Sequence, residues 1–117
     1  MLKRIFLATA VISAPAFADP PIINAVVAEK SGGEWRFDVT LSHGDTGWDH
    51  YADGWRIIDS AGNELGLRML AHPHVNEQPF TRSLSGVKIP DSVSEVGIQA
   101  RDNITGWGPE IKVVKLK

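Results

Sequence analysis

All four histidines of this 117-residue chain lie within 32 consecutive residues. His43 and His50 share one segment with several aspartates, and His72 and His74 are separated by a single proline. In an extended segment, residues i and i+2 point to the same side, so His72 and His74 are expected to project together. Neutral imidazole is a preferred ligand for copper and zinc, and the Irving–Williams order favours copper. The histidine spacing therefore predicts a transition-metal site.

The expected ligand set combines the four imidazoles with two neighbouring carboxylates: His43, His50, His72, His74, Asp49 and Glu77. The alternative is that these histidines cap turns or touch a partner. A calcium loop is disfavoured, because Asp45, Asp49 and Asp53 are four residues apart and do not occupy the alternate positions of an EF-hand. No His-Glu-x-x-His motif occurs, and a blue-copper site would need a cysteine.

Aromatic residues near the histidines suggest a contact surface. Trp48 and Tyr51 lie in the same segment as His50, and Trp107 stands in a Gly-Trp-Gly turn. Exposed aromatic residues are common anchors in binding surfaces, so Trp48, Tyr51 and Trp107 are the expected partner-binding residues. The alternative is that they pack over the ends of the domain.

Two further polar motifs favour structural roles. Glu77 and Arg82 flank Pro79, and a salt bridge between them would hold that turn and orient the histidine loop. Asn103-Ile104-Thr105 matches a glycosylation acceptor, but its position in a hairpin favours turn chemistry.

Alternating apolar residues predict strands throughout the chain after residue 18. The clearest case is Trp35 to Leu41, where every second residue is apolar. The expected strands are Ile22 to Glu29, Trp35 to Leu41, Trp55 to Asp59, Leu65 to Leu70, Phe80 to Ile89, Val96 to Asp102 and Ile111 to Leu116. The expected core comprises Trp35, Phe37, Val39, Leu41, Leu65, Leu67, Val96 and Ile98. Seven short strands with tight turns predict an all-β, seven-stranded antiparallel two-sheet sandwich, with a small open barrel as the alternative.

The segment Val96 to Pro109 resembles the last hairpin of fibronectin type III domains, in which an alternating strand runs into a Gly-x-Gly turn before the final strand. Pro20-Pro21 and Trp55 are also placed as in that family. The resemblance implies a fibronectin type III or immunoglobulin-like sandwich. It implies no particular function, because such sandwiches serve many roles.

The first 18 residues have the pattern of a secretory signal peptide. Lys3 and Arg4 precede an apolar run, and Ala16-Phe17-Ala18 provides small residues at a cleavage site. Residues 19–117 then form one exported domain, periplasmic or secreted, with no membrane span in its mature form. Of the 12 basic residues, Lys3 and Arg4 leave with the signal peptide while all 14 acidic residues remain, so the mature net charge is −4. Such a charge disfavours nucleic acid as a partner.

The chain has no cysteine, which excludes thiol catalysis and thiolate metal sites. No Gly-x-Ser-x-Gly elbow occurs, and adjacent Ser42 and His43 would point to opposite faces of a strand. We therefore expect a non-enzymatic binding protein. The first hypothesis is a periplasmic protein that binds or handles copper or zinc; the alternative is a protein–protein interaction module of the cell envelope that uses the His/Asp/aromatic loop.

We expect cleavage after Ala18, because the small side chains at residues 16 and 18 suit a signal peptidase. Mass spectrometry of exported protein should therefore give a chain that begins Asp19-Pro20. Exported protein that retains Met1 to Ala18 would contradict the assignment.

Overall fold

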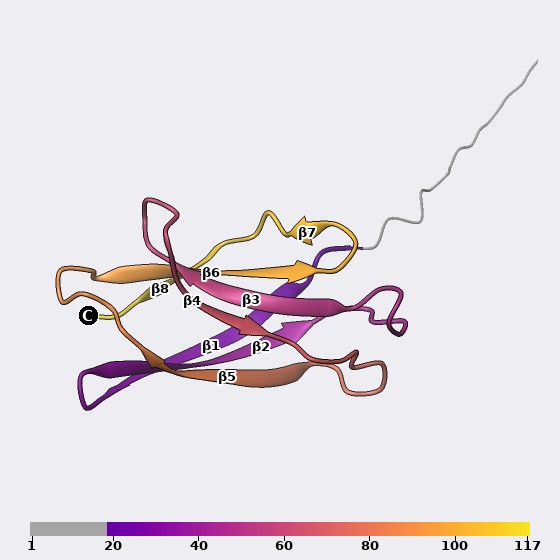
Figure 1. The fold of residues 1–117 in the computed structure, drawn as a ribbon, viewed down its shortest axis with the longest axis horizontal. Helices are drawn as coiled ribbons and strands as arrows, with labels where there is room; N and C mark the ends of the chain where they lie inside the picture. The colour runs from indigo at the N-terminus through magenta and orange to yellow at the C-terminus, as the bar shows by residue number, and fades with distance from the viewer. Residues whose placement is uncertain (1–18) are drawn as a thin grey trace, which may run out of the picture.

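The computed structural model describes residues 19–117, and the predicted signal peptide lies outside these residues. The described chain is all β and antiparallel, with eight strands in two sheets (Figure 1). The strands are β1 (Ile22–Ser31), β2 (Glu34–Ser42), β3 (Ala52–Ile58), β4 (Glu64–Met69), β5 (Phe80–Val87), β6 (Glu95–Asp102), β7 (Gly106–Trp107) and β8 (Lys112–Lys115). No helix among these residues is long and apolar enough to cross a membrane.

The strands divide into two layers. One sheet has three strands in the order β1-β2-β5, and the other has five, in which β4, β3 and β6 are neighbours and β6 also pairs with β7 and β8. β7 pairs with one end of β6 at Arg101 and Asp102, whereas β8 pairs with the other end, from Glu95 to Ile98. The predicted two-sheet antiparallel sandwich is therefore confirmed, with eight strands instead of seven.

The additional strand, β7, lies within a segment whose composition predicts a turn. Gly106 has a φ of +79°, a conformation that residues with a side chain rarely adopt, and it directs the chain back along β6. The Gly108 N–H then donates a hydrogen bond to the Ala100 carbonyl, and Pro109 follows. A proline cannot donate to a ladder, so the pairing is not continued through Pro109, and β8 resumes it further along β6.

The core lies between the two sheets. Its largest fully buried side chains include Trp55 and Phe37, one from each sheet. Of the eight expected core residues, Phe37, Val39, Leu41, Val96 and Ile98 are buried, and Trp35 and Leu65 are half-buried and packed against them.

The expectation that Leu67 is buried was wrong, because 40% of Leu67 is exposed. The neighbouring Gly66 faces the opposite sheet instead, since a Cβ there would lie 3.0 Å from Leu84 and 3.1 Å from Ile57. Arg68, two residues on, donates from Nε to the Ser83 carbonyl of β5 at 2.8 Å. The inward positions of β4 are thus Gly66 and Arg68, and Leu67 faces outward.

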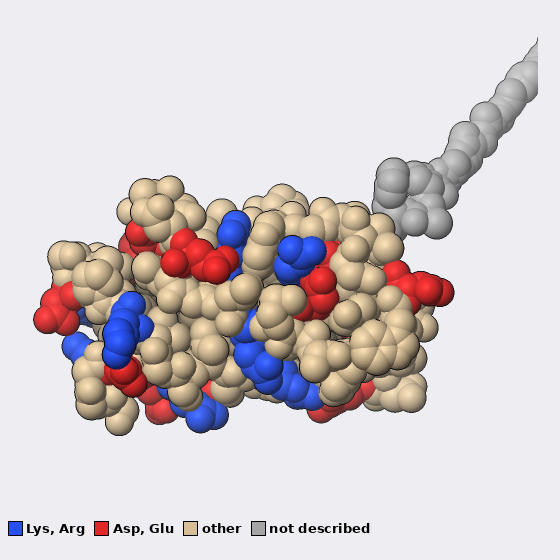
Figure 2. All heavy atoms as spheres, in the orientation of Figure 1, with Lys and Arg blue, Asp and Glu red and all other residues tan. Residues whose placement is uncertain are grey.

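The two ends of the sandwich differ in chemistry. The β1–β2 and β3–β4 turns lie at one end, whereas the 43–51, 71–79 and 103–105 loops lie at the other (Figure 1). All four histidines belong to this second end. Lys and Arg side chains are interspersed with Asp and Glu on the face of the molecule shown in Figure 2.

Phe37→Ala should lower the free energy of unfolding by ~3 to 5 kcal/mol, because it leaves a cavity in a fully buried site. Leu67→Ala is the matched control and should cost under ~1 kcal/mol, because this side chain is already exposed. Urea denaturation followed by tryptophan fluorescence measures both values. Equal losses for the two variants would contradict the orientation assigned to β4.

Candidate metal centre

The 43–51 loop folds back on itself and so brings His50 toward His43. The His50 N–H donates to the Gly47 carbonyl at 3.2 Å, and the Thr46 N–H donates to the His50 carbonyl at 3.0 Å. Gly47 has a φ of +139°, which favours glycine at this position. The two imidazole rings consequently meet edge to face, with their centroids 4.5 Å apart.

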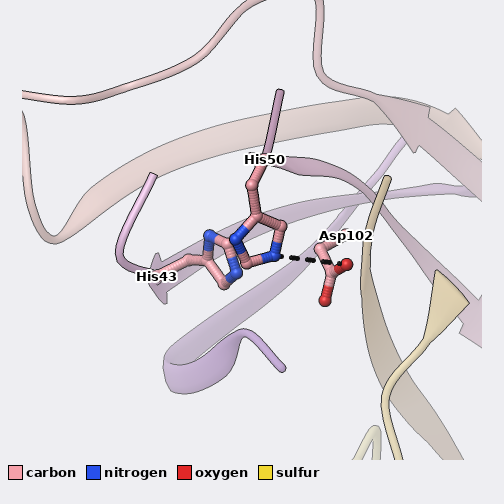
Figure 3. Close-up of side chains that lie close together, drawn as sticks. All are labelled: His43, His50 and Asp102. Atoms are coloured by element: carbon pink, nitrogen blue, oxygen red, sulfur yellow. Dashed lines mark ion pairs between the residues drawn. The ribbon is translucent and has the colours of Figure 1, made fainter. Parts of the chain in front are cut away.

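A carboxylate from β6 lies close to the two rings. Asp102 is the last residue of β6, and its Oδ1 lies 3.5 Å from Nε2 of His50 (Figure 3). One ligand atom from each of His43, His50 and Asp102 lies within 4.8 Å of the others. We call these three residues the His43 cluster. It combines two imidazoles with one carboxylate, a donor set that binds divalent transition metals.

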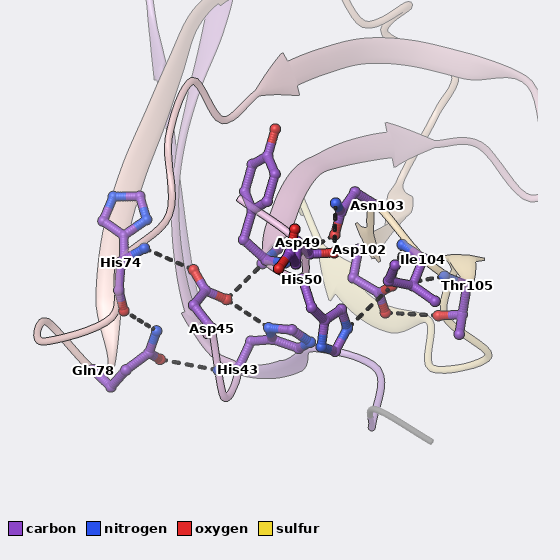
Figure 4. A network of polar contacts seen from close by, with 12 residues as sticks. His43, Asp45, Asp49, His50, His74, Gln78, Asp102, Asn103, Ile104 and Thr105 are labelled. Carbon is purple, nitrogen blue, oxygen red and sulfur yellow. Dashed lines mark hydrogen bonds and ion pairs between the residues drawn. The ribbon is translucent and has the colours of Figure 1, made fainter. Parts of the chain in front are cut away.

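Asp102 is fixed in place by the turn that follows it. Its Oδ1 accepts hydrogen bonds from the Ile104 and Thr105 N–H groups, and its Oδ2 accepts one from the Thr105 hydroxyl at 2.6 Å (Figure 4). Burial raises the pKa of Asp102, but the hydrogen bonds from Thr105 and Ile104 and the proximity of His50 outweigh it and lower the pKa overall. The carboxylate is therefore ionised at neutral pH.

His43 is oriented by a second buried carboxylate. Its Nδ1 lies 2.5 Å from Oδ1 of Asp45, and both side chains are almost fully buried. A carboxylate oxygen accepts hydrogen bonds, so Nδ1 is the ring nitrogen that donates here, and in the neutral ring Nε2 of His43 would then be the nitrogen with the lone pair. This Nε2 is buried and has no hydrogen-bond partner within residues 19–117; the same holds for Nε2 of His50.

His72 and His74 lie in a neighbouring cluster. Their ring centroids are 4.6 Å apart, and His74 stacks on Phe80 at 3.9 Å. His74 is buried, whereas His72 is exposed. Nε2 of His74 accepts a hydrogen bond from the Arg82 guanidinium at 2.8 Å. The structure thus divides the four histidines into two pairs, and neither His72 nor His74 belongs to the His43 cluster.

The expected carboxylate ligands lie outside the His43 cluster. Asp49 is exposed, and its carbonyl accepts a hydrogen bond from the Asn103 amide. Glu77 lies 3.3 Å from Arg82 and 3.9 Å from Nε2 of His74. The predicted Glu77–Arg82 salt bridge is therefore present. The carboxylate within the His43 cluster is Asp102, and the carboxylate next to it is Asp45; neither was among the expected ligands.

The expected partner-binding aromatics have different surroundings. Trp48 is 65% exposed and contacts Tyr51 edge to face, with centroids 5.5 Å apart. Trp107 is half-buried on the outer face of the five-stranded sheet, where the Arg56 guanidinium lies 4.0 Å from its ring centroid. Trp48 is thus the most exposed of these three side chains.

Asn103 links the 103–105 loop to the 43–51 loop through hydrogen bonds. Its Oδ1 accepts from the Tyr51 N–H at 2.8 Å, and its Nδ2 donates to the Trp48 and Asp49 carbonyls. The Asn103-Ile104-Thr105 motif therefore contributes turn chemistry, as its position in a hairpin predicted.

Comparison with known proteins identifies a relative in Halomicrobium mukohataei. This protein, named "Putative lipoprotein", is 36% identical over 93 residues, which cover 80% of the chain and 45% of the relative. The chain thus spans about half the length of the curated relative it matches. No family model and no solved structure matches, so the fibronectin type III resemblance stays a prediction beyond the two-sheet fold itself.

The unfolding free energy should fall as the pH drops from 7 through the ordinary histidine pKa of about 6.5, with His74 as one source. Desolvation lowers the pKa of His74, and so do Arg82 and His72; Glu77 and Asp45 oppose the shift. The folded protein therefore binds a proton at His74 less readily than the unfolded chain does. Its stabilising contribution is complete above the ordinary histidine pKa of about 6.5 and is lost as the pH falls through the lower folded value.

His74→Gln removes this titration, so the variant should lose less stability than the wild type over the same pH interval. Chemical denaturation at a series of pH values measures the difference. Parallel pH curves for the two proteins would show that His74 contributes no pH dependence.

Proposed function

We propose that this chain is an exported, non-enzymatic protein that binds a copper or zinc ion through His43, His50 and Asp102. The observation that carries the proposal is Nε2 of His43, which is buried without a hydrogen-bond partner among residues 19–117 and which bears a lone pair in the neutral ring. A buried polar atom without a partner costs about 1 to 3 kcal/mol, so its retention requires an explanation. A metal ion would provide one, because it would accept this lone pair.

The hydrogen bond from His43 to Asp45 supports the same function. Histidines that ligate metals commonly donate their other ring N–H to a carboxylate, which fixes the tautomer and the ring orientation. Here Nδ1 of His43 is 2.5 Å from Asp45 and Nε2 is the nitrogen left for a metal. This arrangement matches a carboxylate–histidine–metal triad.

The charges distinguish the two histidine pairs. The His43 cluster contains Asp102 and adjoins Asp45, so buried negative charge would favour a cation there. His74 instead accepts a hydrogen bond from the Arg82 guanidinium, which already occupies its Nε2 and would repel a metal ion. The electrostatics therefore favour the His43 cluster.

The donor set and the spacing constrain the metal. Two nitrogens and one oxygen suit zinc and copper, which hold nitrogen at about 2.0 to 2.1 Å. Ligand atoms around such a tetrahedral ion are about 3.3 Å apart, so a separation of up to 4.8 Å requires the cluster to contract. His50 is the most exposed of the three side chains and is the one best able to move.

Export is supported by the named relative. Its name describes a lipoprotein, which fits a protein of the cell envelope. The 117-residue sequence contains no cysteine, so it offers no thiol for lipid attachment. From this relative we therefore infer only a location outside the cytoplasm for this chain, and we do not infer a lipid anchor.

The proposed site lies apart from two surface cavities of the domain. Two surface cavities of about 400 and 450 Å³ are lined by residues of the β3–β4 and β1–β2 turns and nearby strands. Both turns lie at the opposite end of the sandwich from the His43 cluster (Figure 1). No residue of the cluster lines either cavity.

A second candidate function is an interaction module of the cell envelope. Three large apolar side chains are more than half exposed in the three loops around the His43 cluster: Trp48, Val75 and Ile104. Exposed apolar side chains at the tips of adjacent loops favour contact with a partner. This candidate uses the same end of the sandwich without requiring a metal.

At pH 7, zinc or copper should stabilise the fold by ~2.7 kcal/mol when the free metal is a hundred times its dissociation constant. For a domain of this size, the melting temperature should rise by about 10 °C or more, measured by calorimetry. His50→Ala should remove the shift, because it deletes one ligand of the cluster.

His72→Ala is the matched control and should keep the shift, because His72 is exposed and outside the cluster. Loss of the shift in His72→Ala but not in His50→Ala would place the metal at the other histidine pair. Absence of any shift in the wild type would leave the interaction module as the favoured function.

A further inference from the structure

We infer that the 71–79 loop is a latch that positions His43 for metal binding, so that loop closure and metal affinity are coupled. This inference rests on the proposed function, because the coupling matters only if the His43 cluster binds a metal. The loop contributes none of the three ligands. It acts through two residues, Asp45 and Gln78.

Asp45 joins the loop to the ring of His43. Its Oδ1 accepts from Nδ1 of His43 and, at 3.0 Å, from the N–H of Ala52 at the start of β3. Its Oδ2 accepts from the His74 N–H at 2.7 Å. The same carboxylate thus orients the metal ligand and holds the backbone of the loop (Figure 4).

Gln78 joins the loop to the backbone of His43. Its Oε1 accepts from the His43 N–H at 2.9 Å, and its Nε2 donates to the His74 carbonyl at 2.9 Å. The amide therefore connects the ligand residue directly to the residue whose N–H binds Asp45. Both the ring and the main chain of His43 are held by contacts that depend on the closed loop (Figure 4).

The contacts link His43, Asp45, His74 and Gln78 in one ring of hydrogen bonds. Opening of the loop would remove the His74 N–H from Asp45 and Gln78 from His43. The His43 ring would then have to be ordered at the moment of metal binding, which costs affinity. By linkage, a metal that binds the closed form more tightly must also favour closure of the loop by the same factor.

Gln78 is accordingly a positioning residue, and its effect differs from that of a residue needed only for folding. Loss of a merely structural contact would lower the stability of the metal-free protein but would leave the zinc affinity of the folded protein unchanged. Removal of a group that orients a metal ligand typically weakens binding 10- to 100-fold. The affinity for zinc and the protection of the loop are the two readouts that separate these roles.

The test uses the exported chain and zinc ions alone. Gln78→Ala should weaken zinc binding about 10-fold or more, measured by calorimetry on folded protein. Gln78→Glu keeps an oxygen that can accept from the His43 N–H and should recover part of the affinity. Gln99→Ala is the matched control, because Gln99 makes its hydrogen bonds to Arg56 and Gly108 on the outer face of the five-stranded sheet.

Hydrogen exchange provides the second measurement and does not depend on any variant. Zinc should slow exchange of the His74 amide in the wild type, because this N–H donates to Asp45 only when the loop is closed. The measurement remains decisive if Gln78→Ala does not fold.

The two proposals fail in different ways. If the wild type binds zinc at His43 and His50 but exchange at His74 is unchanged, the latch is overturned and the metal site stands. Equal zinc affinities for wild type and folded Gln78→Ala would likewise overturn the latch. If the wild type binds neither zinc nor copper, the proposed function and the latch fall together.

Discussion

The buried carboxylate of Asp45 is the interaction on which the histidine end of the sandwich depends. Its two oxygens accept hydrogen bonds from the ring of His43, the first residue of β3 and the backbone of His74. These donors come from three segments: the 43–51 loop, the start of β3 and the 71–79 loop. A buried carboxylate without such donors would be strongly destabilising, so its burial requires all three segments to converge. The position of the His43 ring, and of Nε2 on its far side, follows from that convergence.

The two histidine pairs show how neighbouring charges give the same residue type different chemistry. Nδ1 of His43 is hydrogen-bonded to a carboxylate and its Nε2 has no partner among the described residues, whereas Nε2 of His74 is hydrogen-bonded to a guanidinium. The first environment suits a cation and the second opposes one. The stacking of His74 on Phe80 further suits a neutral ring, which agrees with its lowered pKa. Four histidines close in sequence therefore do not make one site of four ligands.

The strands could be predicted from the sequence because alternation directly reports which face of a strand is buried. Trp35 to Leu41 illustrates this, with Phe37, Val39 and Leu41 buried as expected. Leu67 was assigned to the wrong face because its apolar character outweighed the neighbouring Gly66, which fits closely against the opposite sheet. In the sequence, a glycine that is required because a side chain would not fit looks the same as a glycine that is required by a turn.

The candidate site was only partly predictable, for a related reason. His43 and His50 could be identified as candidates because they are close in sequence and chemically distinctive. Asp102 could not be paired with them, because its contribution depends on the register of β3 and β6, in which Ala52 lies opposite Asp102. The one available signal was its position at the end of an alternating strand, immediately before a turn. The role of Gln78 depends on a loop conformation that has no periodic pattern in sequence.

The final strand, β8, has a consequence for how copies of the protein meet. It pairs with β6 on one side, and the described strands leave its other side without a partner. Unprotected edges of this kind invite a strand from another molecule to extend the sheet. Here Lys112 and Lys115 flank Val113 and Val114, so a strand added to this edge would place ammonium groups beside apolar side chains. Charged side chains of this kind disfavour strand addition, and here they flank an edge whose Val113 is more than half exposed.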